Sequence, residues 1–176
     1  AQRMLDAGVL DAAQPDVALG VHLWNARPLG WVGIPDGPMM AGADVLEIGI
    51  LGKGGHGAAP HQAHDPVVAA AQVVSALQTI VARNTDPMAT AVVSITQVRA
   101  GEAFNVIPDR AVLRGTVRTF EPVVRQTVLR RIEELAVGVA AAMECAAQVR
   151  LTPLTPPVVN DPRIAASVRA VARRVL

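Results

Sequence analysis

Short segments in which apolar and polar residues alternate, or in which Val, Ile and Thr gather, recur along the chain. Alternation with period two places successive side chains on opposite faces, as in a strand with one buried face. The pattern is clearest at Leu46, Ile48 and Ile50. On this basis the sequence predicts strands at residues 17–24, 44–51, 89–98, 111–119 and 148–151.

Helices are predicted where apolar residues recur every three or four positions. Asp65-Pro66 and Asp161-Pro162 each place a capping carboxylate before a proline at the first helical position. The first pair predicts a helix running to about Arg83, and the second predicts a helix running into the C-terminus. Between them, Pro122 begins a predicted helix that reaches about Met143. The expected inner face of the first helix consists of Val67, Ala70, Ala71, Val74, Leu77, Ile80 and Val81.

The predicted order of elements between residues 44 and 151 is β-α-β-β-α-β. This is the split βαβ or ferredoxin-like pattern, an α+β fold with one antiparallel sheet and two helices on one face. Segments rich in Gly and Pro, residues 25–42 and 153–157, lie on either side and indicate that the unit is inserted into another domain. The sequence therefore predicts a domain at residues 44–152, with residues 1–43 and 153–176 as pieces of a second domain.

Composition narrows the choice of function. The chain has 176 residues, a net charge of +1, no Tyr, two Phe and two Trp. Without a basic stripe or an aromatic platform, a nucleic-acid partner is not expected. No apolar run is expected to approach the roughly 18 residues that cross a membrane, so no membrane partner is expected either. The single cysteine, Cys145, is expected to be a small buried hydrophobe, and a cytoplasmic location follows as the expectation.

The histidines are the first candidates for chemistry. His22 lies in the apolar run 17–24, where a core histidine is a more frequent outcome than a metal ligand. His56 is surrounded by Gly54, Gly55 and Gly57, a backbone that can approach a ligand closely. A mobile surface loop explains the same glycines equally well. His61 and His64, near the start of a helix, are expected to be surface or capping residues.

Two further polar residues stand out. Asn105 lies between apolar neighbours in a turn, where Asn is common for conformational reasons alone. Arg118 lies near the end of a predicted strand and is equally well explained as a solvated charge. An amide and a guanidinium fork could together hold a carboxylate, but nothing in the pattern brings these two residues together.

Several segments, in this order and spacing, resemble the M20 metallopeptidase family and especially its amidohydrolase branch. The resemblance covers about residues 1–125 and is most specific around His56 and Asn105. The segments that carry it are 20–24 (GVHLW), 37–41 (GPMMA), 52–61 (GKGGHGAAPH), 65–67 (DPV), 77–83 (LQTIVAR), 105–109 (NVIPD) and 115–120 (GTVRTF).

The resemblance implies a function and roles for residues. The chain would be part of a metal-dependent amidohydrolase that cleaves N-acyl amino acids or similar small substrates. A ferredoxin-like lid would form a homodimer and be inserted in an α/β zinc-peptidase-like domain. His22 would bind one of two divalent ions (Zn, Mn, Co or Ni). His56 would reach the partner subunit's site and stabilise an oxyanion, and Asn105 and Arg118 would hold the substrate.

This sequence also departs from the family pattern. The family's other metal ligands, a Cys-Gly-His segment, a pair of glutamates and a later histidine, have no match here. One histidine cannot hold two metal ions, so these 176 residues alone are expected to be inactive. The alternative hypothesis is a non-catalytic ferredoxin-like module for oligomerisation or ligand binding.

Overall fold

The computed structural model describes residues 2–175. The chain divides into two compact units, of which unit 2 is residues 38–159 and unit 1 combines residues up to Gly37 with those from Asn160 onward. Unit 2 includes the predicted segment 44–152.

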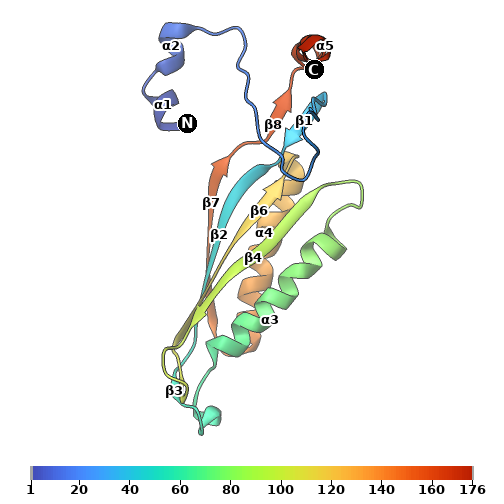
Figure 1. Cartoon of the computed structure of the whole chain (residues 1–176). Coiled ribbons are helices and arrows are strands. Elements are labelled where there is room, and N and C mark those ends of the chain that lie inside the picture. Colours follow the sequence, from blue (N-terminus) through green and yellow to red (C-terminus); the bar gives the residue numbers. More distant parts are fainter. Residues whose placement is uncertain (1, 176) are drawn as a thin grey trace. The chain divides into compact units, whose positions relative to one another are not determined.

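Unit 2 is built on a four-stranded antiparallel sheet with strand order β4-β6-β2-β7 (Figure 1). Two helices, α3 and α4, pack against this sheet and against each other. The β-α-β-β-α-β prediction is confirmed, and the domain is ferredoxin-like. The elements are β2 (Gly42–Leu51), α3 (Pro66–Thr79) with a π-helical turn (Ile80–Asn84), β4 (Ala91–Ala100), β6 (Arg110–Thr119), α4 (Pro122–Ala142) and β7 (Ala146–Thr155).

The core lies between the sheet and the two helices. Leu46, Ile48 and Ile50 of β2 are fully buried there, as the period-two pattern predicted. Residues that alternate with them form the other side of the sheet, which we call the open face. The remaining core residues include Ala69, Ala70, Val73, Leu77, Ile80, Val93, Ala111, Leu113, Val117, Val128, Ile132, Ala136 and Ala140.

The predicted inner face of α3 is partly wrong. Val67 and Val81 are 43% and 40% exposed, whereas Ala69 and Val73 are fully buried. The helix carries no charged side chain between Pro66 and Ala82, so no polar stripe marks its outer side in the sequence. Because periodicity alone cannot orient such a helix, its rotation is decided by packing on the sheet.

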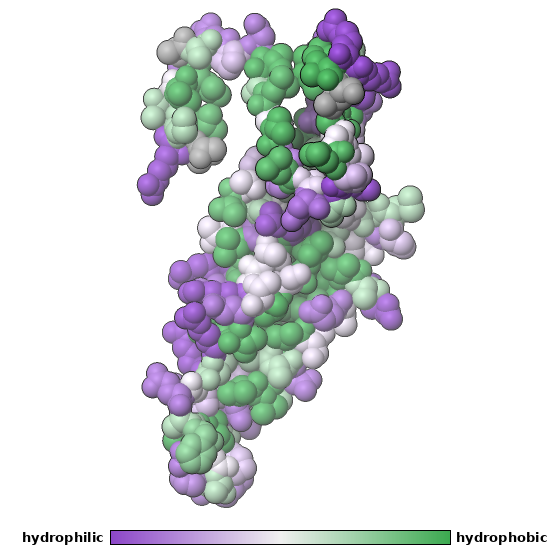
Figure 2. Space-filling model, viewed as in Figure 1, coloured by the Kyte–Doolittle hydropathy of each residue, from purple (hydrophilic) through white to green (hydrophobic). Residues whose placement is uncertain are grey.

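The same lack of charge makes α3 with its π-helical turn, residues 66–84, apolar and long enough to span a membrane by length and composition. The expectation that no apolar run approaches the roughly 18 residues that cross a membrane missed this helix. Leu77 and Ile80 are fully buried against the sheet, so the helix is part of the core of unit 2. Where α3 lies, Figure 2 shows surface that is largely green and white, the colours of hydrophobic and intermediate residues.

Both predicted helix caps are confirmed. The Asp65 carboxylate accepts hydrogen bonds from the backbone N–H groups of Val67 (2.8 Å) and Val68 (3.4 Å). Asp161 accepts from the N–H groups of Arg163 (2.8 Å) and Ile164 (3.2 Å), and these bonds lower the pKa of its carboxyl. Each cap satisfies donors that the first helical turn leaves without a partner inside the helix.

An ion pair between a buried carboxylate and a partly exposed guanidinium joins α4 to β2. Asp44, whose side chain is 3% exposed, accepts from Arg125 Nε at 2.8 Å and Nη2 at 2.5 Å. Hydrogen bonding to Asp44 raises the pKa of the Arg125 guanidinium. The two-point contact fixes the first turn of α4 against the beginning of the central strand.

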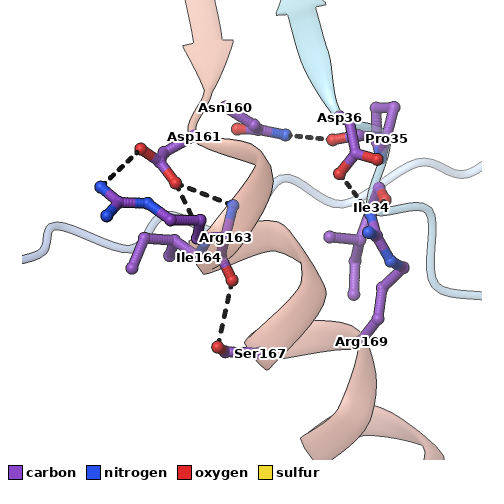
Figure 3. Close-up of polar contacts among 9 residues, drawn as sticks. All are labelled: Ile34, Pro35, Asp36, Asn160, Asp161, Arg163, Ile164, Ser167 and Arg169. Atoms are coloured by element: carbon purple, nitrogen blue, oxygen red, sulfur yellow. Dashed lines mark hydrogen bonds and ion pairs between the residues drawn. The ribbon is translucent and has the colours of Figure 1, made fainter.

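Unit 1 contains α1 (Gln2–Asp6), α2 (Val9–Ala13) and α5 (Pro162–Val175). Arg169 of α5 donates to the Ile34 carbonyl and to the Asp36 carboxylate, both at 2.8 Å (Figure 3). Asn160 donates to the Pro35 carbonyl at 2.9 Å. Segments more than a hundred residues apart in sequence are therefore tied together within this unit. Two short strands that lie mostly in unit 2, β1 (Gly37–Met40) and β8 (Val158–Asn160), pair in a separate sheet that the sequence did not predict.

The prediction of a buried strand at residues 17–24 is wrong. The segment is irregular, and Val21 and Leu23 are 95% and 88% exposed. No strand among the described residues pairs with it. An isolated extended segment has no partner for its backbone groups or its apolar side chains, so hydrophobicity alone does not make it a strand.

Candidate functional site

A two-stranded antiparallel ribbon forms the centre of the candidate site. It consists of β3 (Gly55–His56), which follows β2, and β5 (Val106–Ile107), which precedes β6. Gly55 pairs with Ile107 and His56 with Val106. The glycine-rich segment is therefore held by backbone pairing, which argues against a mobile surface loop, and at Gly54 it packs closely on the chain itself, because a Cβ there would lie 2.8 Å from the Ile107 carbonyl oxygen.

His56 and Asn105 lie next to each other at the tip of this ribbon. The N–H of Gly57 donates to the Asn105 carbonyl at 2.8 Å. A Cβ on Gly57 would come within 3.0 Å of that oxygen, so a larger residue would push the two segments apart. The turn before β5 is closed by a bond from Val106 N–H to the Ala103 carbonyl at 3.3 Å. Together these contacts hold two of the three predicted lid residues in one place.

The hydrogen bonding of His56 defines which ring nitrogen can donate. The N–H of Ala58 donates to His56 Nδ1 at 3.1 Å, so Nδ1 acts as an acceptor. In the neutral imidazole the proton is therefore on Nε2. The side chain is exposed and offers an N–H donor to an acceptor outside the ribbon. A developing oxyanion is an acceptor of this kind.

Phe104 is a feature of the tip that sequence reasoning missed. It directly precedes Asn105, and its side chain is fully exposed at 103%. It is one of only two Phe residues in the chain. The position was readable from the sequence, but its exposure depends on the turn from Ala103 to Val106.

Arg118 lies far from the other two lid residues. It is on the open face of β6, where it pairs with Ala43 of β2 and Val92 of β4. The ribbon joins the other end of β6, next to Arg110. At about 3.3 Å per residue, Arg110 and Arg118 are roughly 26 Å apart along the strand. One chain therefore does not bring Arg118 to the same small ligand as His56 and Asn105.

His22 belongs to unit 1 and is exposed, so the core-histidine interpretation is wrong. Its Nδ1 lies 2.6 Å from the Leu23 carbonyl oxygen. A carbonyl can only accept, so Nδ1 donates and Nε2 keeps its lone pair. This is the form in which imidazole binds a metal, with the second nitrogen fixed by a backbone carbonyl. His22 and His56 thus adopt opposite tautomers, one with a free acceptor and one with a free donor.

Among the candidate residues, His22 alone has the form of a metal ligand. Within residues 2–175, no group of three or more His, Cys, Asp or Glu side chains could hold a metal ion. A catalytic zinc uses three protein ligands, and a two-metal site needs more. The described part of the chain contributes one candidate ligand and cannot form a dinuclear centre alone.

The remaining candidates have structural roles. Cys145 is 7% exposed and its thiol donates to the His64 carbonyl at 3.7 Å, so it is the expected buried hydrophobe. Burial raises the pKa of this thiol, which keeps it protonated and unreactive. His61 is exposed as expected, whereas His64 is half-buried and its Nδ1 lies 3.4 Å from Glu144 Oε2.

Comparison with known proteins agrees with this arrangement. Residues 41–144 match the family described as peptidase dimerisation domain. The chain is 45% identical to an N-acyl-L-amino acid amidohydrolase of Geobacillus stearothermophilus, over 99% of the chain and 48% of that protein. It is 44% identical to an N-acetylcysteine deacetylase of Bacillus subtilis, over 92% of the chain and 42% of that protein.

A solved structure shows the same fold. The Bacillus subtilis YXEP protein, described as a dinuclear metal-binding peptidase from the M20 family, matches with a TM-score of 0.69 and 36% identity, over 99% of this chain and 42% of that one. The chain spans less than half the length of these relatives. From the family match, the identity to these relatives and the ferredoxin-like unit, it follows that the chain belongs to the M20 peptidase family, with its dimerisation domain at residues 41–144.

Proposed function

We propose that this chain is the lid and adjoining part of a metal-dependent amidohydrolase that cleaves N-acyl amino acids. The ribbon that presents His56 beside Asn105 is the observation that carries the proposal. The names of the relatives, an N-acyl-L-amino acid amidohydrolase and an N-acetylcysteine deacetylase, agree with this substrate class. Residues 1–43 and 153–176 would belong to the catalytic domain, which the rest of the natural protein would complete.

In this proposal the chain's residues have separate tasks. Bound divalent ions would activate water and polarise the scissile carbonyl. His22 Nε2 would be one metal ligand. His56 Nε2–H would donate to the carbonyl oxygen as negative charge develops on it, and it is already oriented because Ala58 N–H holds Nδ1. The Asn105 amide would donate to the substrate beside it, and the Arg118 guanidinium would bind the carboxylate of the amino acid.

The separation of these residues supports a site shared by two chains. Arg118 and the ribbon tip are at opposite ends of β6, roughly 26 Å apart. A small substrate that contacts both must therefore take Arg118 from one copy and His56 with Asn105 from another. A two-fold dimer would form two such sites with the same contacts.

We propose that the dimer forms through β4 and α3. β4 is an edge strand whose outer backbone groups have no partner strand among residues 2–175, and Val92 and Val98 are 43% and 60% exposed. No charged residue occurs between Ala91 and Val98 of β4. Uncharged edge strands are open to pairing with a second chain, and α3 is equally uncharged. The other edge strand, β7, contains Arg150 and Pro153, both of which oppose such pairing.

Two acidic substitutions on α3 are expected to separate the dimer. Gln72 and Ser75 are exposed neighbours on one side of the helix. In Gln72→Glu/Ser75→Glu, like charges would meet across the two-fold axis, and we expect the dimer dissociation constant to rise at least about tenfold. Sedimentation velocity measures this constant. The matched control is Val137→Glu/Ala141→Glu on α4, and equal dissociation in both variants would place the interface elsewhere.

The proposed activity is tested with the natural protein that contains this chain. Sequencing the coding DNA on both sides should reveal the remaining metal ligands. Loaded with Zn²⁺, Mn²⁺, Co²⁺ or Ni²⁺, that protein should release amino acid from N-acetyl amino acids, and the 176-residue chain should not. Start and stop codons directly around the chain, or no turnover by the complete protein, would favour the alternative of a non-catalytic oligomerisation module.

A further inference from the structure

The open face of the sheet in unit 2 carries a concentration of positive charge. Every second outward position of β6 holds an exposed arginine: these are Arg110, Arg114 and Arg118, with Val112 and Thr116 between them. Arg99 of β4 is paired with Val112, and Arg150 of β7 is paired with Glu47, so both lie on the same face as these arginines. Glu47 is the single carboxylate among the strand residues of this face.

Most of this charge is not neutralised locally. Arg114 Nε contacts Glu47 Oε2 at 2.7 Å. Arg99, Arg110, Arg118 and Arg150 form no ion pair among residues 2–175. The strand order and register bring them together, because Arg150 of β7 is distant in sequence from the arginines of β4 and β6.

The positive charge of the open face does not reflect an overall excess of basic residues in unit 2. Residues 38–159 contain ten basic and ten acidic residues. A net positive open face therefore requires a net negative charge elsewhere on the unit. On α4 the charges are paired, because Glu134 contacts both Arg130 and Arg131, and this lowers the pKa of its carboxyl. Charge that is sorted onto one face sets up a local positive potential in a unit that is neutral as a whole.

In the middle of the open face, Gly49 leaves space for the side chain of Arg110. A Cβ on Gly49 of β2 would lie 3.4 Å from Arg110 Nη2 and 3.8 Å from its Nε. The Arg110 guanidinium therefore lies across the sheet over a residue without a side chain. Planar guanidinium groups pair well with carboxylates, and every cation on the strands of this face is an arginine.

We propose that the open face concentrates carboxylate-bearing substrates by electrostatic attraction and so raises their occupancy at Arg118. The inference rests on the proposed function, because it assigns the N-acyl amino acid as the anion. Arg118 lies at one end of the arginine row and would make the contact, whereas Arg99 and Arg150 would act at a distance. The scarcity of aromatic residues argues against nucleic acid as the occupant.

The test removes two distant charges and leaves β6 unchanged. In the complete enzyme, Arg99→Gln/Arg150→Gln is expected to raise the KM of an N-acetyl amino acid about two- to threefold at 20 mM salt, with kcat unchanged. The difference should vanish at 0.5 M salt, where charges more than a few ångströms apart are screened. The uncharged carboxamide analogue of the substrate should show no difference. Arg83→Gln/Arg130→Gln removes the same charge from the helices and is the matched control.

Equal KM values for wild type and Arg99→Gln/Arg150→Gln, or an equal rise with the carboxamide, would overturn the inference. A second readout keeps this result separate from failure of the proposed function. N-acetylglycine is titrated into the 176-residue chain at 20 mM salt while the backbone amide signals of β6 are followed. We expect the shifts to be weaker in Arg99→Gln/Arg150→Gln. Absence of any shift in the wild-type chain contradicts the inference whatever the activity.

Discussion

Replacing His56 by alanine in the complete enzyme is expected to lower kcat by about 10²–10³-fold with little change in KM. Removal of one preoriented oxyanion donor has an effect of this size. The structure supports that role because Ala58 N–H occupies Nδ1 and leaves Nε2–H free. Steady-state kinetics with an N-acetyl amino acid measures both parameters. His61→Ala, an exposed histidine of the same loop, is the matched control and should retain activity.

The same variant tests whether two chains share each site. His56→Ala and Arg118→Ala dimers are each expected to be nearly inactive. When their subunits are exchanged, a mixed dimer contains one site with both residues intact. Random exchange should then restore about one quarter of wild-type activity. No recovery after verified exchange would show that both residues act within one chain, against the separation of about 26 Å.

Arg125→Met is expected to lower the free energy of unfolding by about 2–3 kcal/mol, because it leaves the buried Asp44 carboxylate without its partner although Arg125 itself is 37% exposed. Asp44 is the buried partner, with 3% of its side chain exposed, and it would be left without its guanidinium. Urea unfolding of the 176-residue chain, followed by circular dichroism, measures the change.

The matched control is Arg114→Met. Arg114 also pairs with a carboxylate of β2, but Glu47 and Arg114 are 29% and 53% exposed, so the expected loss is below about 1 kcal/mol. The double variant Asp44→Leu/Arg125→Met removes both charges of the pair and should recover most of the loss. Equal losses in Arg125→Met and Arg114→Met would contradict the interpretation that burial makes the Asp44 pair important.

Much of the fold of unit 2 was predictable from local signals. Leu46, Ile48 and Ile50 share one side of a strand, and Asp65-Pro66 begins a helix, whatever the rest of the chain does. The rotation of α3 was not predictable, because a helix without charged residues has no marked outer side. The strand predicted around His22 was wrong for a related reason, since a strand forms only where another strand pairs with it.

For the candidate site, too, the sequence indicated the residues and the tertiary structure decided which of them lie together. The sequence indicated His22, His56, Asn105 and Arg118 as candidates, mainly through the resemblance to M20 proteins, and their roles stay predictions. Only the tertiary structure placed His56 beside Asn105, through a two-residue ribbon too short to leave a periodic signal. It also placed Arg118 at the far end of β6.

The sequence by itself determined the order of elements, the helix caps and the family, because these depend on neighbouring residues and on short motifs. The tertiary structure decided which charges lie together. Arg99, Arg114 and Arg150 share the open face because of how β4 pairs with β6 and how β6 and β7 pair with β2, including the register shift between Ile95 and Gln97 of β4. Strand order and register are set by long-range pairing and packing, which local patterns along the chain do not determine.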